Sequence, residues 1–227
     1  MPQEKAWNDE YKKPKLLSVK NSPQRDVVRF TRWVRKRGFK FKDSKLVDLG
    51  SGNGRNSFYF AGLGADVVGV EISDHSISIA ENNSKESGLD LNYIKSSIGE
   101  VLPFSENSFD LALDIVSSNS LTEKERDIFV SEVSRILKGG GYFLTKALCK
   151  DADKNAKNLL KKFAGTEKDC YTLPAVGITE RVWSREDFID FYGKYFEIIC
   201  LEKKVGFPRV NGQSFKRNFW ICYMQNK

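Results

Sequence analysis

The sequence predicts an α/β fold with a doubly wound, mostly parallel sheet that ends in an antiparallel hairpin. Short apolar runs alternate with helix-like segments between residues 45 and 148, which is typical of a parallel sheet covered by helices on both faces. A glycine-rich turn follows the first of these runs. Two further apolar runs near the end of the chain are joined by only about ten residues, too few for a parallel crossover.

The first half of the chain begins with a polar arm that has at most a short helix, over residues 1–22. Ser22-Pro23 is an N-cap followed by proline, so a helix over 23–38 is expected, with Val27, Phe30 and Val34 on its apolar face and its end at Gly38. Strands are then predicted over 46–50 and 65–72. Helices are predicted over 53–64 and over 74–87, the second capped by Ser73 or Asp74 and ended by Gly88.

The second half continues the alternation with strands over 91–97 and 108–116. A long helix over 121–138 has Thr122 as its N-cap and Glu125 completing a capping box, and a strand over 139–148 follows it. The stretch 149–183 is long for a connection and includes a basic amphipathic piece over 151–163. A helix over 184–195 and strands over 196–204 and 215–225 end the chain. The length suits one domain over 23–227 with an insertion at about 149–183.

Composition limits the classes of function. The net charge of +7 is uneven: residues 1–46 carry 14 basic and 5 acidic side chains, and residues 201–227 carry 6 and 1. These basic ends favour an anionic substrate or nucleic acid, and a solvated basic surface explains them equally well. Four cysteines and one histidine without CxxC or HxxxH spacing predict no metal site. No apolar run reaches the length of a membrane span, and the polar N-terminus indicates a cytoplasmic protein.

The glycine-rich turn lies between a predicted strand and a predicted helix, where α/β sheets bind ligands. Glycine there permits a sharp turn and lets a ligand approach the backbone, and Asp48 at the strand end suits a cationic amino group. Seventeen residues past Gly54, Glu71 ends the second strand, where a carboxylate accepts hydrogen bonds from ribose hydroxyls. A dinucleotide site is the weaker alternative, because the turn reads G-S-G-N-G and Asp48 would repel phosphates.

VDLGSGNGR (47–55), GVEIS (69–73), VLPFSENSFDLALD (101–114) and ILKGGGYF (136–143) resemble successive motifs of the class I S-adenosylmethionine-dependent methyltransferases. The resemblance covers residues 45–148 continuously, and residues 184–198 fit the late helix and strand of the family. It implies a Rossmann-like sheet of seven strands with one antiparallel strand, and S-adenosylmethionine as cofactor. The N-terminal AWNDEYKKP (6–14) resembles the arm of small-molecule enzymes of the thiopurine and tellurite type.

The resemblance also implies roles for single residues. Asp48 and the loop of Gly50, Ser51, Gly52, Asn53 and Gly54 would hold the methionine part of the cofactor. Glu71 would bind the ribose, and Ile72 and Ile98 would flank the adenine. The family has an acidic residue after NYIK, where this chain has Ser96-Ser97, so Ser97 is expected to substitute. Asp114 and Ile115 would lie beside the transferred methyl group, and Tyr11 and Trp7 would fold over the cofactor.

The methyl acceptor is less well defined. The Asn/Asp-Pro-Pro-Tyr turn of enzymes that methylate amino groups of adenine or glutamine is missing after residue 114, and no general base is evident. Candidate acceptor contacts are Ser118 and Asn119 with neighbouring Ser117, Lys146 at a strand end, and Tyr171 and Arg181 in the insertion. A small-molecule methyltransferase is the favoured function. A nucleic-acid methyltransferase and a non-catalytic S-adenosylmethionine-binding protein are the alternatives.

Overall fold

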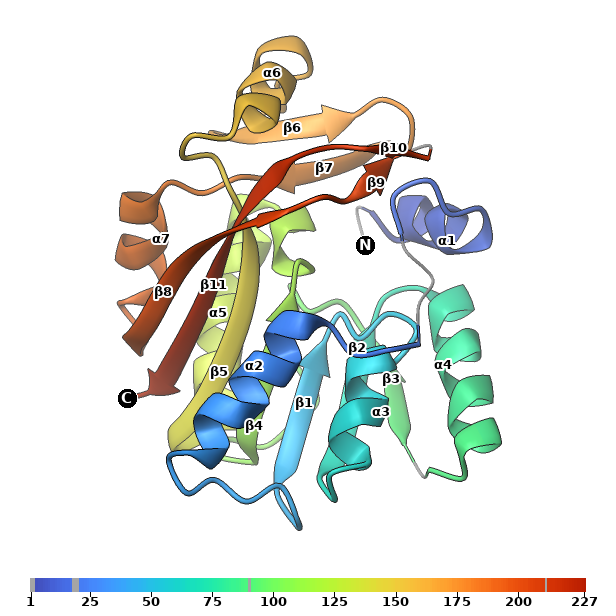
Figure 1. Ribbon diagram of the computed structural model, residues 1–227, viewed down its shortest axis with the longest axis vertical. Coiled ribbons are helices and arrows are strands. Elements are labelled where there is room, and N and C mark those ends of the chain that lie inside the picture. The colour runs from blue at the N-terminus through green and yellow to red at the C-terminus, as the bar shows by residue number, and fades with distance from the viewer. Residues whose placement is uncertain (1–2, 18–20, 90, 211) are drawn as a thin grey trace.

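The computed structural model describes residues 3–17, 21–89, 91–210 and 212–227. Its centre is a seven-stranded sheet in the order β3-β2-β1-β4-β5-β11-β8 (Figure 1). The strands are β1 (Lys45–Leu49), β2 (Asp66–Glu71), β3 (Asn92–Lys95), β4 (Phe109–Ile115), β5 (Leu137–Cys149), β8 (Phe196–Gly206) and β11 (Arg217–Asn226). Only β11 runs antiparallel to its neighbours β5 and β8. The predicted doubly wound sheet with a C-terminal antiparallel hairpin is confirmed.

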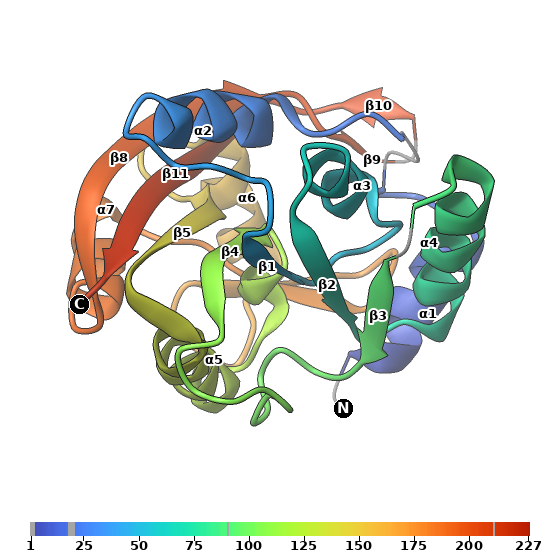
Figure 2. The ribbon, with the colours of Figure 1, turned by 90° about the horizontal axis from the view of Figure 1, so that it is seen from below.

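Helices cover both faces of this sheet. The helices α2 (Arg25–Arg35) and α3 (Arg55–Ala61) lie on one face, and α5 (Glu123–Ile136) and α7 (Arg185–Tyr192) lie on the other, while α4 (Asp74–Ser87) flanks β3 (Figure 2). Val27, Phe30 and Val34 of α2 are fully buried, as their spacing predicted. Each face of the sheet therefore has its own apolar core, so the strands are buried on both sides.

Additional elements gather beyond the carboxyl ends of the parallel strands, at the top of Figure 1. They are α1 (Glu4–Lys12), the 3₁₀ turn η1 (Ser118–Ser120), α6 (Lys154–Lys162), the antiparallel pair β6 (Cys170–Leu173) and β7 (Ile178–Arg181), and the short pair β9 (Arg209–Val210) and β10 (Gln213–Ser214). The strand order reverses between β1 and β4, and such a switch point leaves a crevice at the carboxyl ends. These elements close that crevice into a cavity.

The helix signals in the sequence are confirmed in most places. Ser73 caps α4 and Gly88 ends it in a left-handed conformation, and Thr122 and Glu125 form the predicted capping box of α5. The predicted start of α2 is wrong, because Gln24, not Ser22, is its N-cap. Gln24 is held there through its backbone N–H, which donates to Asn56 Oδ1 at 3.1 Å. This long-range contact has no local signal in the sequence.

Other boundaries also differ from the prediction. Helix α2 ends at Arg35 and not at Gly38, and strand β5 begins at Leu137, before the three glycines. The insertion at 149–183 forms α6 and the β6–β7 hairpin. Part of the predicted arm, residues 1–2 and 18–20, lies outside the described residues. In the described part of the chain, no helix is both long and apolar enough to cross a membrane. The same residues include no group of three or more His, Cys, Asp or Glu side chains placed to hold a metal ion.

Candidate functional site

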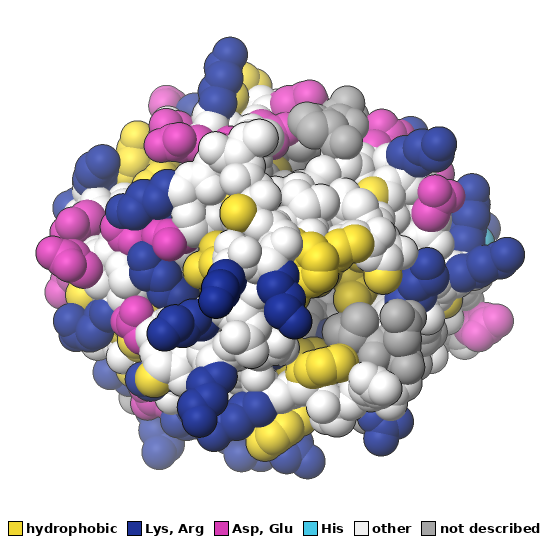
Figure 3. Space-filling view, turned by 90° about the horizontal axis from the view of Figure 1, so that it is seen from above, with side chains coloured by type: hydrophobic (Ala, Val, Ile, Leu, Met, Phe, Trp, Pro, Cys, Tyr) yellow, Lys and Arg dark blue, Asp and Glu magenta, His cyan; other side chains and the backbone are white. Residues whose placement is uncertain are grey.

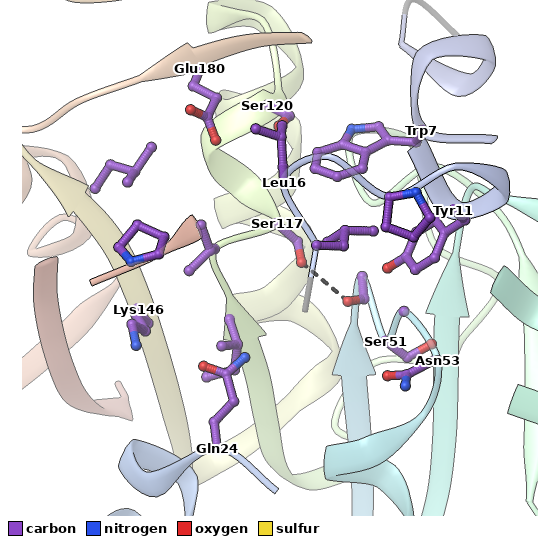
Figure 4. Close-up of a pocket in the computed structure, with 18 of the residues that line it drawn as sticks. Trp7, Tyr11, Leu16, Gln24, Ser51, Asn53, Ser117, Ser120, Lys146 and Glu180 are labelled. Atoms are coloured by element: carbon purple, nitrogen blue, oxygen red, sulfur yellow. Dashed lines mark hydrogen bonds between the residues drawn. The ribbon is translucent and has the colours of Figure 1, made fainter. Parts of the chain in front are cut away.

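A cavity of about 1160 Å³ lies at the carboxyl ends of β1, β2 and β4 (Figure 4). Its floor is the glycine-rich loop after β1, and its walls come from the arm, from η1, and from the elements after β5 and β8. Figure 3 shows this end of the molecule, with hydrophobic side chains exposed near the centre among Lys and Arg side chains. The cavity therefore combines a polar floor with a partly apolar, positively charged opening.

The glycine-rich loop passes close to side chains on both sides. A Cβ atom added to Gly50 would lie 2.2 Å from Ser117 Oγ, and one added to Gly52 would lie 2.6 Å from the hydroxyl oxygen of Tyr11. Gly50 and Gly52 also have positive φ angles of 72° and 58°. Glycine is therefore required at both positions for conformation and for space.

Glu71, at the end of β2, fixes the same loop from below. Its carboxylate accepts hydrogen bonds from the backbone N–H groups of Gly52, Ile72 and Ser73, each at 2.9 Å. Burial raises the pKa of Glu71, and these three N–H groups partly oppose the increase. The side chain lines the cavity with its position set by the backbone around it, as a ribose-binding carboxylate requires.

Asp48 lies under the loop and not in the cavity wall. It is buried, and Ser57 Oγ donates to its Oδ2 at 2.7 Å. Burial, with the nearby Glu71 adding to the effect, raises the pKa of Asp48 to about 6. Arg55, which does line the cavity, lies close enough to lower that pKa, and its own pKa is lowered by burial. The floor of the site thus holds two buried carboxylates beside one arginine.

The segment after β4 is held by Asp114. This fully buried carboxylate accepts hydrogen bonds from the N–H groups of Ser117 and Ser118 and from the hydroxyls of Ser118 and Thr145. Val116 has a φ of 71°, which is strained for a β-branched residue, and its N–H donates to the Lys146 carbonyl at 2.8 Å. Strain of this kind is typical of functional sites, and Val116 lines the cavity.

This conformation decides which residues of the segment reach the cavity. Ser117 and Ser120 line it, and the buried Ser120 hydroxyl has no hydrogen-bond partner among the described residues. Ser118 is turned inward to Asp114, and Asn119 accepts a hydrogen bond from the Leu148 N–H at 3.2 Å. Of the three acceptor contacts predicted in this segment, Ser117 lines the cavity, whereas Ser118 and Asn119 are used inside the fold.

The arm closes the cavity from the side of α4. Asn8 Oδ1 accepts hydrogen bonds from the Ser73 hydroxyl and the His75 N–H, which ties α1 to the start of α4. Glu10 is buried, and its Oε1 accepts from the N–H groups of residues 15, 16 and 17 at 2.6–3.0 Å. Trp7 and Tyr11 project into the cavity above the loop (Figure 4).

Gln3, the residue before α1, connects the arm to the insertion. Its amide nitrogen donates to the carbonyls of Ser120 and Thr179, and its amide oxygen accepts from the Thr179 N–H at 2.8 Å. These bonds cross from the arm to η1 and β7. The N-terminal arm and the insertion therefore form one continuous wall.

The wall opposite the glycine loop is mostly apolar. Lys146 lines it, but its ammonium group is paired with Asp26 at 2.8 Å and lies 4.6 Å from the centre of the Phe219 ring. We call this part of the cavity the apolar chamber. Its apolar side chains come from several separate segments of the chain and include Leu16, Leu148, Leu159, Leu173, Phe207, Phe215 and Phe219. The chamber suits a small molecule with an apolar body.

The structure brings most of the predicted site residues together. The following line the cavity: Trp7, Tyr11, Gly50, Ser51, Gly52, Asn53, Glu71, Ile72, Ser97, Ile98, Ile115 and Lys146. The predicted residues that are not part of its wall are Asp48, Gly54, Asp114, Ser118, Asn119, Tyr171 and Arg181. Gly54 instead faces Tyr93, and Arg181 lies over the Trp183 ring and donates to the Lys168 carbonyl.

Sequence reasoning missed several charged residues of the wall. Arg25 and Arg55 line the cavity, Arg55 directly after the glycine loop, and neither forms an ion pair with a described residue. Glu180 and Arg217 line the acceptor side. Arg55 directly follows Gly54, so its position was a usable signal. Glu180 and Arg217 lie in strand segments without a recognisable motif, so the sequence gave no indication that they line the cavity.

Known proteins similar to this chain agree with the geometry. Residues 47–145 match a family model described as a methyltransferase domain. The ubiquinone biosynthesis O-methyltransferase of Pelagibacter ubique is 30% identical over 178 residues, which are 77% of this chain and 66% of that protein. Squalene methyltransferase 1 of Botryococcus braunii is 35% identical over 122 residues, which are 52% of this chain and 32% of that protein. The chain thus spans at most two thirds of these relatives.

Solved structures show the same fold. The 1,6-didemethyltoxoflavin-N1-methyltransferase of Burkholderia thailandensis, solved with its substrate and S-adenosylhomocysteine, superposes with a TM-score of 0.74 at 14% identity. The match covers 99% of this chain and 87% of that one. Residues 47–145 thus belong to the methyltransferase domain family, and the seven-stranded sheet with the glycine loop above Glu71 has the fold of the S-adenosylmethionine-dependent methyltransferases.

Proposed function

We propose that this protein binds S-adenosylmethionine on the glycine loop and transfers its methyl group to a small molecule held in the apolar chamber. The main support for this proposal is that a single cavity is lined by the glycine loop and Glu71 on one side and by the arm, the insertion and the β9–β10 segment on the other. A cofactor and an acceptor that share one enclosed space can be held in line for direct transfer.

The residues of the floor fit the cofactor. The buried Ser51 hydroxyl lines the cavity without a hydrogen-bond partner among the described residues, and the missing Cβ of Gly52 leaves the backbone open to a ligand. Glu71 would accept the ribose hydroxyls, and Ile72 and Ile98 would flank the adenine. Arg25 and Arg55 would pair with the carboxylate of the methionine part, because a carboxylate that loses its hydration needs a cationic partner.

When bound, S-adenosylmethionine supplies an activated methyl group on a positively charged sulfur. The protein's own part is to orient the two reactants and to exclude water. Trp7 and Tyr11 cover the loop, and Gln3 ties their helix to the insertion. Removal of the acceptor's proton is a separate requirement, which depends on the nucleophilic atom.

A small acceptor is supported by the size and lining of the chamber. The relatives described above are named for ubiquinone biosynthesis, squalene and 1,6-didemethyltoxoflavin, all small molecules. Nucleic-acid binding through the basic ends, a role without catalysis, and a cytoplasmic location stay predictions. So does the division of the chain into an arm over 1–22 and a single domain over 23–227.

The test is a calorimetric titration of the purified protein with S-adenosylmethionine and with S-adenosylhomocysteine. The Glu71→Ala variant should bind each ligand about 10- to 100-fold more weakly, as expected for lost hydrogen bonds to a charged group. Glu81→Ala, an exposed position on α4, is the matched control and should bind normally. A folded wild-type protein that binds neither ligand would overturn the proposal.

A further inference from the structure

A chain of four polar side chains runs from the protein interior to the acceptor side of the cavity. The Tyr171 hydroxyl donates to Glu180 Oε2 at 2.7 Å, and Arg217 Nη2 donates to the Tyr171 oxygen at 2.9 Å. Arg217 is paired in turn with Asp153, the N-cap residue of α6, at 3.4 Å. These residues come from β7, β6, β11 and α6, so the tertiary fold alone assembles them.

The exposure of these groups differs along the chain. Tyr171, Arg217 and Asp153 are buried, with relative exposures of 0%, 7% and 5%, whereas Glu180 is half-buried; Glu180 and Arg217 both line the cavity. Figure 4 shows the Glu180 carboxylate pointing into the cavity, on the same side as Ser120. Oxygen Oε2 is held by Tyr171, and no described residue donates to Oε1. One oxygen is therefore anchored while the other faces the chamber.

The buried members keep this arrangement in a single protonation state. Burial, with Glu180 beside it, raises the pKa of Tyr171 well above 10, so the phenol stays protonated and remains a donor. Arg217 donates to the phenol oxygen, which leaves the phenol hydrogen directed at Glu180. Other candidates for a base in the cavity wall are already engaged: Lys146 is paired with Asp26, Glu71 accepts three backbone N–H groups, and Glu125 accepts from Thr122 in the capping box.

We propose that Glu180 is the general base of the methyl transfer and that Tyr171 is its positioning residue, so that the acceptor carries a hydroxyl group on an apolar body. The inference rests on the proposed function. The acceptor oxygen bonds to the methyl carbon as the carbon–sulfur bond breaks, and the electron pair of that bond passes to sulfur. The acceptor's proton moves to Glu180 Oε1 and is then released to water.

The test compares three methyl-acceptor probes: catechol, aniline and thiophenol. Thiophenol ionises by itself in mildly alkaline buffer, and aniline attacks through the lone pair of its neutral nitrogen, so neither needs a base, whereas catechol does. Formation of S-adenosylhomocysteine is followed for the wild type and for Glu180→Gln, with Glu197→Gln on the exposed side of β8 as control. Glu180→Gln should lower catechol methylation about 100-fold or more and leave any thiophenol or aniline methylation nearly unchanged.

A pH profile and a binding measurement separate catalysis from structure. The catechol rate of Glu180→Gln should recover as the pH rises toward the ionisation of catechol itself, because the ionised acceptor needs no base. In Tyr171→Phe the kcat for catechol should fall while its KM stays nearly unchanged, because the carboxylate loses the donor that orients it. Catechol should also bind the S-adenosylhomocysteine complex of Glu180→Gln about tenfold more weakly than that of the wild type.

The contrary outcomes are distinct. Equal loss of thiophenol and catechol methylation in Glu180→Gln, or an unchanged catechol rate, would overturn the role of Glu180. So would a wild-type complex that methylates thiophenol or aniline but not catechol, or that does not bind catechol. If S-adenosylmethionine itself fails to bind in the calorimeter, the proposed function fails instead. Because cofactor binding is measured on every variant, the two failures are distinguishable.

Discussion

The hydroxyl oxygen of Tyr11 lies over the backbone of Gly52, so close that a Cβ atom at this glycine would be 2.6 Å from it. The first residue belongs to the N-terminal arm, and the second belongs to the loop that follows β1. Their contact means that the shape of the cofactor site depends on the arm being in place. The same contact predicts that a substitution adding a Cβ atom at Gly52 displaces Tyr11.

Gly52→Ala should weaken S-adenosylmethionine binding at least tenfold, because the new methyl group displaces Tyr11 and strains a φ of 58°. Gly88→Ala is the control: Gly88 has a φ of 65° but nothing within 4 Å of an added Cβ. It should cost about 1–2 kcal/mol of stability and leave the affinity unchanged. Calorimetry and thermal unfolding check both variants. Equal effects of the two substitutions on affinity would show that the Tyr11 contact is irrelevant.

Asp48→Asn should stabilise the ligand-free protein at neutral pH. The pKa of Asp48 is about 6 in the folded protein and 3.8 ordinarily, so the folded state binds the proton more tightly. Stability attributable to this group is then full below about pH 4, and it falls as the pH rises through 6, by up to about 3 kcal/mol. Denaturant unfolding of both proteins from pH 4 to 8 measures the difference. Parallel curves would contradict the raised pKa, since Glu71 and Asp114 are present in both proteins.

Glu10→Ala should open the arm without unfolding the domain. The buried carboxylate accepts from three consecutive N–H groups, and each bond to a charged group contributes about 1.5–3 kcal/mol. Amide hydrogen exchange at residues 15–17 should become about 10- to 100-fold faster, and S-adenosylmethionine should dissociate faster. Asp9→Ala, an exposed neighbour on α1, should change neither rate. Unchanged exchange in Glu10→Ala would mean that the arm is held by its other contacts.

Asp114→Ala should lower the free energy of unfolding by about 2–4 kcal/mol. The substitution leaves the N–H groups of Ser117 and Ser118 and two hydroxyls without their acceptor, although it also removes a buried charge. Urea unfolding measures the loss, and Asp127→Ala on the exposed face of α5 serves as control. A loss of cofactor affinity with full stability would instead support the direct contact that the family resemblance implies.

The fold was predictable because its signals are local. Alternating apolar runs, the capping box of Thr122 and Glu125, and the left-handed end of α4 at Gly88 are each set by residues a few positions apart. The start of α2 was missed because it depends on Asn56, about thirty residues away. The start of β5 was placed two residues late because Leu137 follows a helix directly and pairs with Phe109 of β4.

The part of the cavity proposed to bind the cofactor was predictable from the sequence, and the part proposed to bind the acceptor was not. The loop from Gly50 to Asn53 and the end of β2 at Glu71 are adjacent in any parallel sheet, because the carboxyl ends of neighbouring strands meet at one edge. Within residues 117–120, by contrast, the side chains that reach the cavity are Ser117 and Ser120. The orientation of the 3₁₀ turn decides which of these side chains face the cavity, and no local pattern in the sequence predicts that orientation.

The sequence by itself therefore determined the sheet, its helices and the cofactor loop, since each follows from periodicity, capping and turn chemistry within short stretches. Tertiary structure alone decided what covers the loop and what faces the acceptor. Gln3 forms a hydrogen bond with Thr179, 176 residues away in the sequence. Tyr171 forms hydrogen bonds with both Glu180 and Arg217. Such contacts form because buried polar groups must find partners wherever the packing places them, and local sequence does not encode that placement.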